Sequence, residues 1–122
     1  MGFSHEATKH AFHLRKDGGA IEVTANSADD AKSIDAIRQH MKDVAKSFAS
    51  GDFAKPEFIH GKLPDGAAVM RDRKDRIQYR YVEKPAGAQV LINTEDAQAL
   101  TAVHEFLRFQ ITEHKTGDSL AP

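Results

Sequence analysis

Apolar residues recur along the chain with two different periods, and the change of period separates predicted strands from predicted helices. Early in the chain four apolar residues alternate with polar ones on either side of a Lys-Asp-Gly-Gly turn: Phe12, Leu14, Ile21 and Val23. A period of two is typical of strands with one buried face, and Asp-Gly and Gly-Gly favour a tight hairpin turn. We therefore predict a β-hairpin from His10 to Thr24, with these four residues on its buried side.

A helical period follows the hairpin. Ser27, with Asp30 three positions later, resembles a capping box. Five apolar residues spaced by three or four then form a single stripe: Ile34, Ile37, Met41, Val44 and Phe48. Charged residues occupy the opposite side, as is typical of a helix that packs on one face. We expect this helix to end at Gly51.

The next stretch, from Asp52 to Arg76, is irregular because Pro56 and Pro64 interrupt it. Within it, the pattern of 57–60 indicates a short edge strand, and that of 67–74 indicates a short helix.

The hairpin pattern then returns. Apolar and aromatic residues alternate with polar ones on either side of a turn at 84–87: Ile77, Tyr79, Tyr81, Val90 and Ile92. The last helix is predicted from Glu95 to about Lys115, with Asn93 or Thr94 as its cap, on a stripe of four residues: Leu100, Val103, Leu107 and Ile111. Gly117 is placed to stop it, and residues 116–122 are predicted to fray.

The order hairpin, helix, linker, hairpin, helix predicts a single α+β domain over residues 1–122. The halves at about 10–52 and 76–118 match in pattern, so we interpret them as a duplicated ββα unit joined by an irregular linker at 53–75. Two apolar hairpin faces and two apolar helix stripes pack most simply as one four-stranded antiparallel sheet with both helices on one face.

The last helix carries apolar residues outside its main stripe, namely Ala102, Phe106 and Phe109. A helix with one buried face would leave Phe109 in water, so a second buried face is expected, formed by a loop or by a partner chain. From this we predict a homodimer with these three residues at its interface.

Composition restricts the classes of function. The chain has 122 residues, of which 40% are hydrophobic and 29% charged, as in an ordinary globular domain. It has no cysteine, which excludes disulfides, thiolate metal sites and cysteine nucleophiles. A net charge of −1 gives no broad attraction to polyanions, so neither a nucleic-acid partner nor membrane insertion is expected. We also expect no signal peptide, since residues 1–5 lack a basic start and an apolar run.

Histidine is the enriched residue type, with seven in the chain. Neutral imidazoles bind copper and zinc, and a methionine sulfur suits copper(I). His10 shares a strand face with Phe12 and Leu14, so it can meet His60 or His114 at the end of the sheet, whereas His13 leaves the other face. We predict a metal or ligand site made by His10 and His60 with Met70 nearby, and copper or zinc as the ion. The alternative for His40, His104 and His114 is a hydrogen bond to a carbonyl or an acid.

Four stretches together resemble a family of small bacterial proteins: MGFSHEATKHAFHL, DGGAIEVTAN, FASGDFAKPEFIHG and HEFLRFQITEHKTGD. The resemblance covers nearly the whole chain, and the last stretch is the most specific. Members of that family usually begin with an export signal, so the resemblance implies a periplasmic or secreted location. Some carry the label aspartate carbamoyltransferase, but the chain is too short for that two-domain enzyme and has no Ser-x-Arg-Thr phosphate motif.

These observations favour a non-enzymatic, exported, homodimeric module that binds a small ligand or a metal ion, with copper preferred. No Gly-rich phosphate loop follows a strand, and no serine lies in a nucleophile-elbow pattern. Two alternatives stay open. One is a structural or protein-interaction domain whose histidines only pack. The other is a small hydrolase or isomerase with a histidine base in a cleft between the sheet and the irregular middle.

Overall fold

The computed structural model describes residues 7–53 and 65–121. It confirms the predicted α+β class and the four-stranded antiparallel sheet. The elements, in chain order, are β1 (Thr8–Arg15), β2 (Gly18–Ala25), α1 (Ala31–Ala49), α3 (Ala67–Asp72), a 3-10 turn (Lys74–Arg76), β3 (Ile77–Lys84), β4 (Gly87–Thr94) and α4 (Ala97–His114). The short strand predicted at 57–60 lies outside the described residues.

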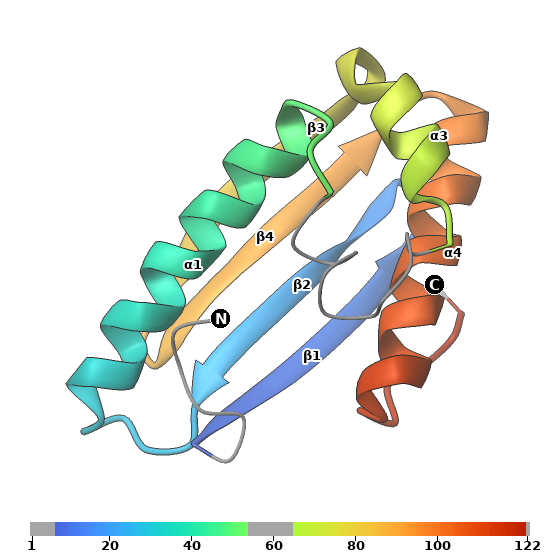
Figure 1. Cartoon of the computed structure of the whole chain (residues 1–122). Coiled ribbons are helices and arrows are strands. Elements are labelled where there is room, and N and C mark those ends of the chain that lie inside the picture. Colours follow the sequence, from blue (N-terminus) through green and yellow to red (C-terminus); the bar gives the residue numbers. More distant parts are fainter. Residues whose placement is uncertain (1–6, 54–64, 122) are drawn as a thin grey trace.

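The two hairpins join through their second strands. The sheet has the order β1-β2-β4-β3, with every neighbouring pair antiparallel. Ile21 of β2 lies opposite Val90 of β4 at the centre, and both are buried beneath the helices. Gly18 allows the two strands to approach, because a Cβ at its position would overlap the carbonyl oxygen of Ile92. Both long helices cover the same face (Figure 1).

Each long helix packs mainly on the hairpin that it does not follow. The chain enters α1 from β2, yet α1 lies over β3 and β4; it enters α4 from β4, yet α4 lies mainly over β1 and β2 (Figure 1). The two halves of the chain therefore complete each other's core.

One polar residue of each helix holds the turn of the hairpin beneath it. Arg38 of α1 donates from Nη2 to the carbonyl of Lys84 (2.8 Å) and from Nε to that of Gly87 (3.2 Å). His104 of α4 contacts the carbonyls of Arg15 (2.7 Å) and Gly18 (3.1 Å) through Nε2. Both of its partners are acceptors, so Nε2 carries the hydrogen. The four carbonyls occupy matching places in the two turns, while descent from one duplicated unit stays a prediction.

The second buried face of α4 is filled from within the chain. Phe106 is 1% exposed, and its ring meets Phe48 at 5.6 Å and Phe53 at 5.9 Å in edge-on contacts. Ala102 lies against Gly66, where a Cβ would overlap the carbonyl oxygen of Ala102. Phe109 is buried as well. The three residues predicted at a dimer interface are thus covered within one chain, and dimerisation itself stays a prediction.

The C-terminal tail is held against the body rather than frayed. Asp118 accepts a hydrogen bond from the backbone N–H of Phe12 (3.0 Å) and one from the Thr116 hydroxyl (2.7 Å). Arg108 of α4 donates to the carbonyl of Leu120 (2.8 Å). The prediction of a frayed tail was wrong because β1 is an edge strand whose outward N–H needs a partner, and the carboxylate supplies one.

Replacing Phe106 with alanine should lower the free energy of unfolding by about 3–5 kcal/mol, because it removes a ring that packs on two others in the core. Urea denaturation measures the loss. Val69→Ala is the control: this side chain is 39% exposed, so its replacement should cost less than about 0.5 kcal/mol. A small effect at Phe106 would contradict the packing described.

Candidate functional site

Two histidines from opposite ends of the chain meet on the helix side of the sheet. The ring of His10 on β1 stacks on the ring of His114 at the end of α4, with centroids 5.3 Å apart and planes 7° apart. Phe12 lies beside both, 5.6 Å from His114 and 6.4 Å from His10 between ring centroids. Of the two meetings predicted for His10, the one with His114 is present; we call these two residues the His10–His114 pair.

Local structure explains why the pair forms. Alternation along β1 directs His10 and Phe12 toward the helices and leaves His13 exposed on the open face. α4 runs along β1 and ends at His114, where Lys115 adopts a left-handed conformation with φ 52°. His114, the last residue of α4, therefore lies against His10 on the inner face of β1.

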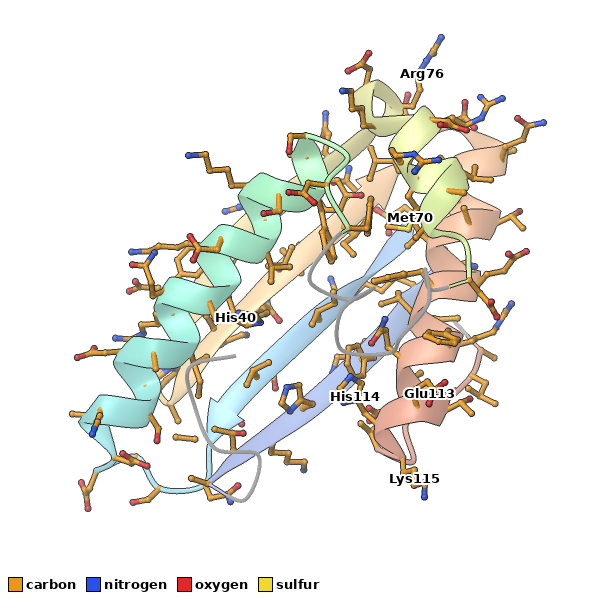
Figure 2. The ribbon with its side chains drawn as sticks, in the orientation of Figure 1. His40, Met70, Arg76, Glu113, His114 and Lys115 are labelled. Carbon is orange, nitrogen blue, oxygen red and sulfur yellow. The ribbon has the colours of Figure 1, made fainter. Side chains whose placement is uncertain are left out.

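The surroundings of the pair favour positive charge. The C-terminal carbonyls of α4 carry the negative end of the helix dipole, which stabilises a cation near His114. The Asp118 carboxylate bonds the backbone of Phe12, the next aromatic neighbour of both rings. Glu113 precedes His114, and Lys115 is the cation that follows it (Figure 2). A bound cation would be stabilised by the dipole at this end of α4.

Met70, another predicted member of the site, lies elsewhere. Met70 of α3 is completely buried, and Figure 2 shows it well separated from His114. His60 falls outside the described residues. Across 7–53 and 65–121, no group of three or more histidine and acidic side chains could hold a metal ion. The site of His10, His60 and Met70 thus stays a prediction, while the described part brings His10 to His114.

His104 and His40 lie in surroundings that differ from those of the stacked pair. His104 follows the predicted alternative of a histidine bonded to carbonyls. His40 lies on the side of α1 away from Arg38 and Lys42, which reach the β3–β4 hairpin. It is half-buried on the helix side of the sheet (Figure 2). The structure therefore gives these two residues different environments from the stacked pair.

Two open hollows lie at the end of the molecule where α4 begins. One, of about 510 Å³, is lined by Arg76, Gln78, Asn93, Thr94, Glu95 and Asp96. The other, of about 620 Å³, lies between α3 and α4. Neither is lined by a histidine. Several polar groups of the first hollow already maintain the fold, since Thr94 donates to the carbonyl of Arg76 (2.6 Å) and Asn93 bonds Gln78 (3.3 Å).

Asp96 caps the start of α4, a role that the sequence analysis assigned to other residues. We predicted Asn93 or Thr94 as the cap of the last helix, but Asp96 is the cap: its carboxylate accepts from the N–H groups of Gln98 and Ala99, both at 2.9 Å. It also pairs with Arg73 at 2.9 Å. The Ala99 N–H and the Arg73 guanidinium lower the pKa of Asp96 below its usual value. Four polar residues in a row, at 93–96, precede the helix and left the choice open.

The alternation of residues predicted Tyr79 on the core face, but it did not predict that the hydroxyl is buried. The hydroxyl is buried beside the ring of Phe48 and has no hydrogen-bond partner among the described residues. Burial raises the pKa of Tyr79 well above its usual value. Tyr79 therefore acts as a neutral aromatic residue under α1, not as an acid or base.

No family model, curated protein or solved structure matches the chain. None of the described helices combines the length and apolar character that crossing a membrane requires.

Replacing Asp96 with asparagine should lower the urea midpoint at neutral pH, because the cap remains but its charge toward Arg73 and the helix dipole is lost. The pKa of Asp96 is depressed by folding, so its contribution is present above about pH 4 and is lost as the pH falls through the lower, folded value. The difference between the two proteins should therefore shrink in acid.

Asp72→Asn is the matched control, since Asp72 is exposed and its pair with Arg71 is long at 3.6 Å. A midpoint difference for Asp96→Asn that is absent at neutral pH, or that persists unchanged near pH 2, would contradict this role.

Proposed function

We propose that the chain binds a metal ion, or a small ligand of similar chemistry, through the His10–His114 pair, with copper favoured over zinc. The observation that supports this most is the pair itself: two imidazoles, held by an edge strand and by a helix end, with ring centroids 5.3 Å apart. Such a pair supplies two nitrogen ligands from rigid elements.

The chemistry of imidazole favours borderline and soft ions. Each neutral ring offers one nitrogen lone pair, and small rotations about the side-chain torsions would let both nitrogens approach one ion. Among divalent first-row ions, copper binds nitrogen ligands most strongly, which is why it is favoured over zinc. His60 stays the further ligand that the sequence predicts, whereas the proposal does not need Met70, which is buried in the core.

The charges around the pair also support a cation. The dipole of α4 ends at His114, and Asp118 is anchored beside Phe12 by the bond to its N–H. We assign no reaction to this site and infer a binding module. A periplasmic or secreted location, implied by the sequence resemblance, would suit such a module.

Isothermal titration with Cu²⁺ and Zn²⁺ tests this function. We expect binding tighter than about 10 μM for copper, weakened at least about tenfold in His10→Gln and in His114→Gln, because each change removes one ligand. His13→Gln is the matched control, since His13 lies on the same strand but on the exposed face. Affinity should also fall in acid, because protons compete with the metal ion for the imidazoles.

Two outcomes would contradict the proposal. One is wild-type affinity no tighter than about 1 mM. The other is unchanged affinity in both variants with a lower free energy of unfolding, which would show that the two rings only pack and would favour the structural alternative.

A further inference from the structure

The two edge strands of the sheet, β1 and β3, differ in whether another described segment bonds their outward backbone groups. Along β1, the N–H of Phe12 points away from β2 and is bonded by Asp118 at 3.0 Å. Alternate residues of an antiparallel strand face the same side, so the even-numbered residues of β1 direct their backbone groups outward. The anchored tail therefore covers part of this edge.

The opposite edge strand, β3, has the same alternation of inward and outward backbone groups, but no segment among the described residues bonds its outward groups. Both hairpins have a two-residue turn between paired ends, Arg15 with Gly18 and Lys84 with Gly87, so the alternation is equivalent. Four residues of β3 thus direct their N–H and C=O groups away from β4: Ile77, Tyr79, Tyr81 and Glu83. In the part of the chain that the structure describes, no backbone or side-chain group bonds them.

We propose that β3 pairs antiparallel with the β3 strand of a second copy, so that the sheet continues across a two-fold axis. Eight residues of unbulged strand without an internal proline present a row of unpaired backbone groups, which a second strand satisfies. A two-fold axis is the usual symmetry of a homodimer, and it gives both copies the same contacts.

The side chains select the register. With the axis at Tyr81, this residue lies opposite the partner's Tyr81, Arg80 opposite the partner's Val82, and Tyr79 opposite the partner's Glu83. No like charges then face each other. Centring the axis on Arg80 would place two guanidinium groups opposite each other, which is destabilising. The charges on β3 therefore disfavour the Arg80-centred register and are compatible with the register centred on Tyr81.

The helices above the strands fit this arrangement. α1 lies over both β3 and β4, so its axis runs above the line between them. With strands about 4.8 Å apart, two copies of α1 would lie about 10 Å apart, the ordinary distance between packed helices. The side of α1 that faces the axis carries Lys42, 5.5 Å from the centroid of the Tyr81 ring, and the small residues Ala45 and Ala49. Arg38 lies on the same side, and its side chain, like that of Lys42, bends down onto the β3–β4 hairpin.

Analytical ultracentrifugation of the wild-type chain at micromolar to millimolar concentrations should show a monomer–dimer equilibrium. Tyr81→Pro should give a monomer, because proline removes an outward N–H while leaving the bonds to β4 intact. Tyr81→Thr is the matched control: it keeps the N–H and the strand propensity and should still dimerise. Circular dichroism establishes that each variant is folded.

A second test does not depend on the proline variant. The chain has no cysteine, so single cysteines report contacts cleanly. Under mild oxidation Tyr81→Cys should form an intermolecular disulfide, because paired Cα atoms across the axis are about 5.5 Å apart. Gln78→Cys is the control on the same strand, since its own copies would lie about 20 Å apart.

Three results would overturn the proposal. These are a monomeric wild type at millimolar concentration, a folded Tyr81→Pro variant that still dimerises, and cross-linking at Gln78 that is as rapid as at Tyr81.

Discussion

The pairing of β2 with β4 is the constraint on which the rest of the structure depends. Without it the chain would be two hairpins, each too small to bury an apolar face by itself. With it, Ile21 and Val90 meet at the centre of one sheet, and Gly18 allows the strands to approach. Because each helix crosses to the other hairpin, neither half has a complete core alone. Arg38 and His104 then fix each helix to the turn beneath it.

The same constraint determines which distant residues meet and which strands form the edges of the sheet. Joining the hairpins through their second strands makes β1 and β3 the edges of the sheet. α4, packed over β1, ends where His10 faces it, so two residues at opposite ends of the sequence become a stacked pair. The tail that follows α4 bonds the edge of β1 through Asp118, whereas no equivalent segment in the described residues bonds β3. The proposed ligand site and the proposed docking edge thus both follow from one topology.

Sequence patterns predicted what depends on local periodicity. Both hairpins, α1 and the sheet face of Phe12 were predicted because alternation and a single helical stripe identify them. The second face of α4 was recognised, but its partners were not, because Phe48 and Phe53 are distant in sequence. The tail contact, the capping residue Asp96 and the meeting of His10 with His114 depend on how separate elements meet in space. The periodicity of a single stretch does not predict which residues of separate elements come into contact.

One measurement tests the central claim, that a single sheet brings the ends of the chain together. In an NMR spectrum of the labelled protein, we expect nuclear Overhauser contacts between the paired residues Ala20 and Leu91 of β2 and β4, and between the rings of His10 and His114. Contacts confined to each hairpin, with none between β2 and β4 and none between the two rings, would contradict the account.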